Sequence, residues 1–342
     1  MPCPKVLFPD NLYMLILNMS EIYVKQEHLK ILPQADALLF DVDGVILDVS
    51  GSFRVTIVRT VQLYATHVLK WEDTGQLLEL DEIDLFKMAG GFNSDWDLTC
   101  TAVAFLVAKH CQSGTTDTAT IRAQEPSWQE YTSEIKRLGG GFVNAEKYLL
   151  EMLTPTQRRN FAVMLNPKLV TQLFQEMYAG EEDCFPLYGF HPQHLHDDGL
   201  YKNEKVLLDA KLIPPKMKVG LLTGRTSSET RLAMKMAGLN IEEKTWVTED
   251  HGVRKPDGRA MAKLHDAMKF KFGIFVGDTM DDLSVVKNYR ELAGITHAKV
   301  LSCIVLPGGE THRRAFLEAG ADIVASDVNQ FLEFFGQVSN VK

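Results

Sequence analysis

The second half of the sequence alternates short apolar runs with segments of helical spacing. The apolar runs are 217–222, 245–248, 272–276, 300–306 and 322–325, and the helical segments are 227–237, 257–269, 279–292, 311–319 and 328–335. This alternation predicts a parallel β-sheet with helices on both faces, because parallel strands are joined by crossovers that are usually helical. Ligands of such sheets bind at the carboxyl ends of the strands.

Residues 51–202 interrupt this alternation. An apolar strand is predicted at 35–40, but the stretch that follows has mostly helical spacing and no convincing strand pattern. Within it, residues 112–127 are polar and are predicted to form a loop. We therefore predict a helical domain at 51–202, inserted into an α/β core made of residues 35–50 and 203–342. Residues 1–34 form an N-terminal extension.

Four segments with reactive side chains lie at or after the ends of predicted strands. They are D-V-D-G-V at 41–45, L-T-G-R at 222–225, R-K-P-D at 254–257 and V-G-D-T-M-D-D at 276–282. Each of them is a common turn or cap when it occurs alone. Parallel strands have their carboxyl ends at one edge of the sheet, so the predicted topology brings the four segments together. Their joint occurrence indicates a functional site at that edge.

The predicted edge is strongly acidic. It holds one lysine, Lys255, against the carboxylates of Asp41, Asp43, Asp278 and Asp282. Like charges 4 Å apart repel by about 4 kcal/mol at an effective dielectric near 20, so a further cation is needed. Oxygen ligands favour Mg²⁺, which would then attract a phosphate group. Asp278 and Asp282 are one helical turn apart, so the first could ligate the metal and the second could orient Lys255 or a metal-bound water.

Spacing within the other segments suggests further roles. Side chains alternate along a strand, so Asp41 and Asp43 point the same way if the strand continues through them. This shared direction suits one carboxylate to attack phosphorus and the other to handle the proton of the leaving group. Thr223 offers a hydroxyl group, and Gly224 lets the backbone approach a phosphate closely.

The four segments resemble the four motifs of the haloacid-dehalogenase-like (HAD) phosphatase superfamily. The resemblance covers residues 35–50 and about 203–342, and the helical insertion is similar to the cap that some members carry between the first and second motifs. It implies a Rossmann-like parallel sheet with an all-helical cap domain. At about 150 residues, the insertion is enlarged relative to the ordinary helical cap of the superfamily.

The resemblance also implies roles for individual residues. Asp41 would be the nucleophile that forms an aspartyl-phosphate, and Asp43 would be the general acid and base. Asp278 would ligate Mg²⁺ together with Asp41 and the main-chain carbonyl of Asp43. The remaining matches are Thr223, Gly224 and Lys255 as phosphate-binding residues and Asp282 as a supporting acid.

The expected function is a Mg²⁺-dependent phosphatase that hydrolyses a small phosphorylated metabolite. An aspartate two residues after the nucleophile indicates phosphatases and phosphomutases rather than the dehalogenase branch. A sugar phosphomutase remains an alternative, although the nearest counterpart of its hinge histidine, His67, lies well inside the insertion. A non-catalytic binding protein of the same fold is the other alternative, and the intact charge cluster argues against it.

Some residues outside the core motifs are candidate ligand contacts. Residues 87–97 lie where the resemblance places the specificity loop of the cap, and Lys87 and Asn93 could contact the substrate there. The alternative is that this segment only ends one helix and caps the next. Arg225, directly after the second motif, is a further candidate substrate contact. Three histidines within 191–196 could bind a transition metal, but the proline and the connecting position favour a solvated hinge loop.

The composition limits which binding partners and which cellular compartment are expected. Acidic residues outnumber basic ones by 45 to 36, which gives a net charge of −9 and argues against a nucleic-acid partner. The apolar run 12–17 is too short to span a bilayer, so no membrane association is expected. Five widely spaced cysteines predict neither a disulfide framework nor a zinc site, and indicate a reducing, cytoplasmic compartment. Nothing in the sequence supports a homo-oligomer.

Overall fold

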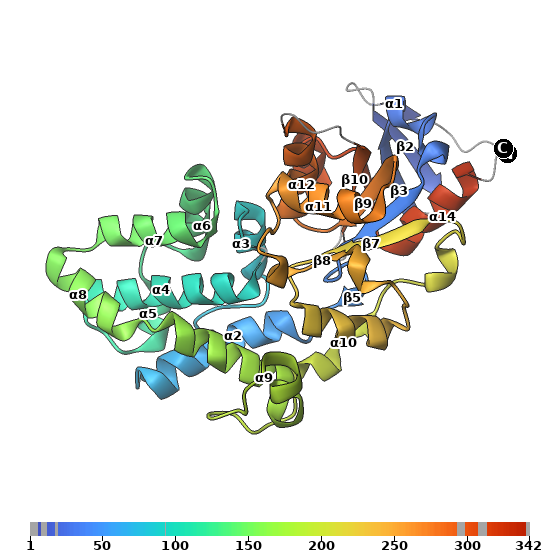
Figure 1. The fold of residues 1–342 in the computed structure, drawn as a ribbon. Coiled ribbons are helices and arrows are strands. Elements are labelled where there is room, and N and C mark those ends of the chain that lie inside the picture. The colour runs from blue at the N-terminus through green and yellow to red at the C-terminus, as the bar shows by residue number, and fades with distance from the viewer. Residues whose placement is uncertain are drawn as a thin grey trace. The chain divides into compact units, whose positions relative to one another are not determined.

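The chain forms two compact units, one of residues 1–48 and 205–342 and one of residues 49–204. The computed structural model describes residues 6–7, 12–17, 20–92, 94–292, 298–306 and 313–339. The first unit contains a large β-sheet and the second is helical (Figure 1). No helix within the described ranges has the length and apolar character that crossing a membrane requires.

The sheet of the first unit has a parallel centre. Its strand order is β1-β2-β3-β11-β10-β9-β4-β7-β8. The parallel strands, in spatial order, are β11 (Ile323–Ala325), β10 (Lys299–Val305), β9 (Phe272–Gly277), β4 (Ala37–Phe40), β7 (Lys218–Leu222) and β8 (Trp246–Val247). This is the parallel sheet that the strand–helix alternation predicts, and the α/β fold class is confirmed.

Both faces of the parallel centre are buried. On β4, Ala37 and Leu39 join an apolar cluster with residues of α11 (Gly258–Met268) and α12 (Met280–Glu291). Leu38 and Phe40 point to the opposite face and are equally inaccessible to solvent. A strand that is buried on both faces is typical of the centre of a parallel sheet. The other helices of this unit are α1 (Gln26–Leu29), α10 (Ser227–Ala237), α13 (Arg313–Glu318) and α14 (Val328–Ser339).

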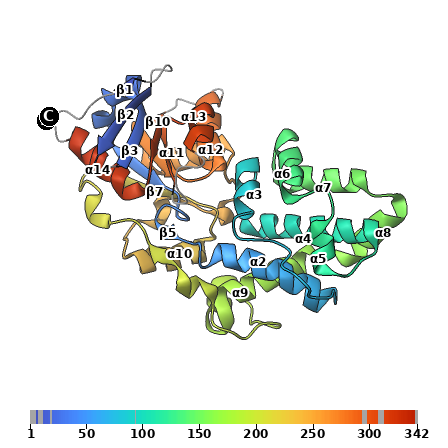
Figure 2. The same ribbon diagram turned by 180° about the vertical axis from the view of Figure 1, so that it is seen from behind.

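The N-terminal extension adds antiparallel strands that the sequence analysis did not predict. β3 (Ser20–Lys25) pairs with β11, β2 (Leu12–Leu17) pairs with β3, and β1 (Val6–Leu7) pairs with β2. α14 packs against β3 and β11, so segments close to the two ends of the chain lie side by side (Figures 1 and 2). The extension is therefore part of the sheet.

A buried carboxylate ties this antiparallel edge to the parallel centre. Asp322 lies 3.1 Å from Lys25 Nζ and 3.1 Å from His28 Nε2, and it also pairs with Arg290. The backbone N–H and the hydroxyl of Ser302 donate to it at 2.9 and 3.0 Å. Burial alone would raise the pKa of Asp322, but the hydrogen bond from His28 and the charge of Arg290 outweigh it and hold that pKa well below its usual range.

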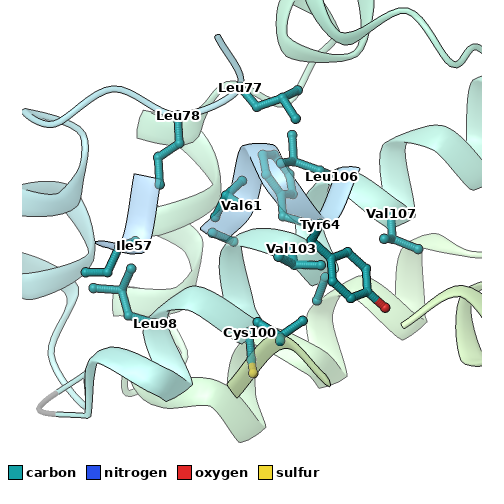
Figure 3. Close-up of a cluster of buried hydrophobic side chains, with 14 of the residues drawn as sticks. Ile57, Val61, Tyr64, Leu77, Leu78, Leu98, Cys100, Val103, Leu106 and Val107 are labelled. Atoms are coloured by element: carbon teal, nitrogen blue, oxygen red, sulfur yellow. The ribbon is translucent and has the colours of Figure 1, made fainter. Parts of the chain in front are cut away.

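The second unit is built around one buried helix, α4 (Asp95–Ser113), which packs against α2, α7, α8 and α9. Every residue from Leu98 to Lys109 is buried, as expected for a helix that is covered on all sides. Figure 3 shows Ile57 and Val61 of α2 together with Leu98, Val103 and Leu106 of α4 in this core. The other helices are α2 (Phe53–Leu63), α3 (Ile83–Ala89), α5 (Thr118–Ala123), α6 (Trp128–Arg137), α7 (Gly141–Met152), α8 (Pro155–Met164) and α9 (Pro167–Tyr188).

One prediction for this unit is wrong. Residues 112–127 were expected to form a loop, but they contain α5. Asp117 caps this helix by accepting from the N–H of Thr120 at 2.7 Å, and Ile121 is fully buried in the helical core. The chain leaves and re-enters the first unit through β5 (Leu47–Asp48) and β6 (Lys205–Val206), which pair antiparallel.

Replacing Asp322 by asparagine should lower the free energy of unfolding at pH 7 by about 3–5 kcal/mol, because the buried pairs lose one partner. A carboxylate whose pKa is depressed in the fold stabilises it above the unfolded pKa, and this contribution is lost as the pH falls. The difference between wild type and Asp322→Asn should therefore shrink below about pH 4. Urea denaturation at pH 7 and at pH 3 measures both quantities.

The exposed pair between Arg314 and Glu318 provides the control. Glu318→Gln should leave the stability nearly unchanged at both pH values, because exposed ion pairs contribute little. If the Asp322→Asn difference stayed constant between pH 7 and pH 3, the charge of Asp322 would not be the source of its contribution.

Candidate active site

Three neighbouring strands end where the predicted segments begin. β4 lies between β7 and β9 and is parallel to both. Asp41 follows the last residue of β4, Thr223 that of β7, and Asp278 that of β9. The N–H of Asp41 donates to the carbonyl of Val276 at 2.9 Å, which fixes the end of β4 beside β9. The carboxyl edge of the sheet thus brings together residues that the sequence separates widely.

Lys255 links two of the carboxylates at this edge. Its Nζ lies 2.8 Å from Asp41 Oδ2 and 2.6 Å from Asp282 Oδ1, and its side chain has no exposed surface. Burial alone lowers the pKa of Lys255, but the charges of Asp282 and Asp41 outweigh it and raise that pKa above its usual value. The ammonium group therefore stays charged and neutralises part of the acidic cluster.

Asp41 is the most perturbed carboxylate of the site. Burial raises the pKa of Asp41 to about 7; the Lys255 ammonium opposes this shift, and the charges of Asp282 and Asp43 add to it. The N–H of Val42 donates to Asp41 Oδ1 at 2.7 Å and holds the side chain in place. Asp41 is therefore only partly ionised at neutral pH, and a cation bound beside it would favour the charged form.

Asp282 turns back toward the loop that precedes its own helix. Its Oδ2 accepts from the N–H of Asp278 at 3.1 Å and of Thr279 at 2.9 Å, and Thr279 caps α12 in return. Gly277 leaves the room for this, because a Cβ there would lie 2.3 Å from the Cβ of Asp282. Since Oδ1 pairs with Lys255, both oxygens of Asp282 serve to hold the lysine and the loop.

The cluster fits a divalent cation by its chemistry. Asp41, Asp278 and Asp282 each offer a carboxylate oxygen, and these oxygens lie within 4.8 Å of one another. Carboxylate oxygens are the hard ligands that Mg²⁺ prefers. Because Asp282 already binds Lys255 and two N–H groups, Asp41 and Asp278 are the stronger candidate ligands.

Gly44 makes the approach of Asp278 possible. Its φ angle is +70°, and a Cβ at this position would lie 2.1 Å from Asp278 Oδ2. Only glycine combines this conformation with no side chain. Gly44 belongs to the segment D-V-D-G-V, but no role was predicted for it from the sequence. The signal that could have found it is a glycine directly after the paired aspartates, where the chain must turn.

Asp43 is placed differently from the expectation. β4 ends at Phe40, so the strand alternation that would point Asp41 and Asp43 the same way does not extend to Asp43. Instead, Arg225 Nε donates to Asp43 Oδ1 at 2.7 Å. Arg225, the candidate substrate contact, therefore faces Asp43, and its side chain is 1% exposed. Thr223 Oγ1 accepts from the N–H of Arg225 at 3.2 Å.

The candidate specificity loop in the helical unit is held by contacts of its own. Lys87 Nζ lies 2.7 Å from Asp95 Oδ1 and donates to the carbonyl of Phe92 at 3.2 Å. Ser94 caps α4, as the alternative interpretation expects. Asn93, the other predicted contact, lies outside the described residues. Substrate recognition by this loop stays a prediction.

The histidine-rich segment is organised by a buried glutamate. The carboxylate of Glu176 accepts from the N–H groups of Gln193, His194 and Leu195 at 2.8–3.0 Å. These bonds fix the backbone of the segment without using an imidazole group. Across the part of the chain that the structure describes, the histidines form no group of three metal ligands.

Comparisons with known proteins identify the fold. No protein-family model and no curated protein matches the chain. Among solved structures, a phosphatase from Thermococcus thioreducens is similar, with a TM-score of 0.56 and 21% identity over 89% of this chain and 99% of that one. A protein described as a phosphoglycolate phosphatase from Lactobacillus delbrueckii subsp. bulgaricus has a TM-score of 0.50 and 13% identity over 88% of this chain and 98% of that one. The chain has the HAD-like fold, with a large helical insertion after its first motif.

Replacing Gly44 by alanine should damage the metal site, because the added Cβ collides with Asp278. Gly238→Ala is a matched control: its φ of +64° is similar, but nothing lies within 4 Å of the added Cβ. Both variants should lose about 1–2 kcal/mol of stability from backbone strain. Only Gly44→Ala should also weaken Mg²⁺ binding, measured by titration calorimetry. Wild-type Mg²⁺ affinity in Gly44→Ala would contradict this assignment of the site.

Proposed function

We propose that the chain is a Mg²⁺-dependent phosphatase that hydrolyses a small phosphorylated metabolite through an aspartyl-phosphate on Asp41. The observation that carries this proposal is the Lys255 ammonium shared between Asp41 and Asp282 at the carboxyl edge of the parallel sheet. A buried carboxylate beside a fixed cation suits a nucleophile that must approach a phosphate dianion.

The residues around Asp41 supply what a phosphoryl group requires. Lys255 would contact a phosphate oxygen, and the hydroxyl of Thr223 and the backbone at Gly224 offer further contacts at the end of β7. Mg²⁺, held by Asp41, Asp278 and the carbonyl of Asp43, would withdraw charge from the phosphate oxygens. With a net charge of −9 on the chain, this local concentration of cations is what attracts an anionic substrate.

The proposed reaction has two steps. In the first, a carboxylate oxygen of Asp41 bonds to phosphorus while the bond from phosphorus to the ester oxygen breaks. The ester oxygen keeps the electron pair of that bond, takes a proton from the Asp43 carboxyl group and leaves as an alcohol. In the second, a water gives its proton to the Asp43 carboxylate and attacks phosphorus. The bond to Asp41 breaks, and inorganic phosphate is released.

Asp41→Asn should abolish the release of phosphate from 4-nitrophenyl phosphate in the presence of Mg²⁺, because an amide cannot take the place of the attacking carboxylate. The variant should still be folded at the assay temperature, as circular dichroism would show, because Lys255 keeps Asp282 as a partner, although the loss of one buried contact should lower the melting temperature. The wild type should lose activity in excess chelator and recover it with Mg²⁺. A panel of phosphorylated metabolites under the same conditions then identifies the preferred substrate.

The control is Asp266, an exposed aspartate that pairs with Lys269, and Asp266→Asn should keep full activity. Turnover by Asp41→Asn would contradict the covalent mechanism, and turnover in chelator would contradict the role of the metal. A wild type that isomerises its substrate and needs a bisphosphate activator would be a phosphomutase instead.

The candidate specificity loop generates a separate prediction. If Lys87 contacts the substrate, Lys87→Ala should lower kcat/KM for the best metabolite by roughly tenfold and spare 4-nitrophenyl phosphate, because remote contacts orient only a substrate that makes them. Asn93→Ala should act in the same way. Asp95→Asn is the matched control, since it breaks the ion pair with Lys87 and keeps the lysine. Equal effects of Lys87→Ala and Asp95→Asn on both substrates would show that the pair only stabilises the loop.

A further inference from the structure

Arg225 is the largest fully buried side chain among the described residues, and it carries a charge. Its side chain is 1% exposed. A guanidinium group removed from water is costly unless its N–H groups find acceptors, so such a residue is bound to a specific partner. The role of Arg225 therefore depends on which groups its guanidinium contacts.

One partner is Asp43, the second aspartate of the first motif, and the contacts with it reach one of its two carboxyl oxygens. Arg225 Nε donates to Asp43 Oδ1 at 2.7 Å, and Arg225 Nη2 lies 2.6 Å from the same oxygen. Two N–H groups from one planar guanidinium fix the direction of the carboxyl group. Oδ2 takes no part in this pair. The Asp43 side chain is 26% exposed, so the carboxyl group is open to solvent on part of its surface.

The backbone of Arg225 is itself held in place. Its N–H donates to Thr223 Oγ1 at 3.2 Å, and its carbonyl accepts from the N–H of Glu249 at 3.0 Å. The next residue, Thr226, caps α10 in a capping box with Glu229. Arg225 thus extends from the junction of β7 and α10, and it reaches Asp43 from a rigid position.

We propose that Arg225 is a positioning residue, which anchors Oδ1 of Asp43 so that Oδ2 exchanges the proton with the leaving group and with water. This inference rests on the proposed phosphatase function and adds that the two oxygens of one carboxyl group have different roles. Asp43 Oδ2 gives its proton to the ester oxygen as the bond from phosphorus to that oxygen breaks. It later takes a proton from the attacking water. In this role Arg225 acts through its contact with Asp43 and exchanges no proton itself.

The dependence on the leaving group separates this role from a structural one. A 4-nitrophenolate leaves without help, whereas the alkoxide of glycerol 2-phosphate must be protonated as it leaves, and general acid catalysis supplies about 10²–10⁴ in rate. Arg225→Met should therefore lower kcat/KM for glycerol 2-phosphate at least about tenfold more than for 4-nitrophenyl phosphate. Asp43→Asn should show the same signature, and adding Arg225→Met to it should leave the ratio of the two substrates unchanged.

The ratio is measured on one preparation, so the fraction of folded enzyme cancels. Arg225→Lys keeps the charge but not the two-pronged contact, and it should restore the ratio in part. Arg231→Met removes an arginine of α10 that pairs with Glu243 and should leave the ratio at the wild-type value. A wild-type ratio in both Arg225 variants would overturn the positioning role and leave the phosphatase intact. A wild type that hydrolyses neither ester would overturn the phosphatase and, with it, this inference.

Discussion

The buried ammonium group of Lys255 lies between two buried carboxylates, and the structure of the sheet edge depends on keeping these three charges together. Each ion alone would cost several kcal/mol to remove from water. The contacts of Lys255 with Asp41 at 2.8 Å and with Asp282 at 2.6 Å offset this cost only if all three side chains lie together. They come from the end of β4, the loop before α11 and the first turn of α12. A parallel sheet is a topology that delivers such distant segments to one edge.

Asp278 and Asp282 can lie this close to the backbone only because two neighbouring positions are glycine. Gly44 makes room for Asp278, and Gly277 makes room for Asp282. Gly44 thereby allows the first motif to lie against the fourth, whereas Gly277 acts within the fourth motif itself. Burial is the main cause of the raised pKa of Asp41, and the charges of Asp282 and Asp43 add to it. The same geometry that holds Lys255 therefore gathers carboxylate oxygens that suit a divalent cation.

The sequence predicts features that depend on local signals. The parallel strands of the core are short apolar runs, and the reactive segments follow their ends, so both the sheet and its active edge could be inferred. The antiparallel edge could not, because Lys25 and Asp322 meet across 297 residues and no local pattern encodes that contact. The contact between Asp43 and Arg225 spans 182 residues and was missed for the same reason. α5 was missed because its sequence is mostly polar and Ile121 is its single buried apolar residue.

The two aspartates of the first motif differ in environment more than in chemistry. Asp41 pairs with the fully buried Lys255, and the side chain of Asp41 is 7% exposed. Asp43 pairs with the buried Arg225, but the side chain of Asp43 is 26% exposed. An enclosed carboxylate suits a nucleophile, because water would compete for its lone pairs and solvate its charge. A carboxyl group that is anchored on one oxygen and partly exposed suits proton exchange with a leaving group or water. In the proposed reaction, two buried cations, Lys255 and Arg225, would thereby give two identical side chains different tasks.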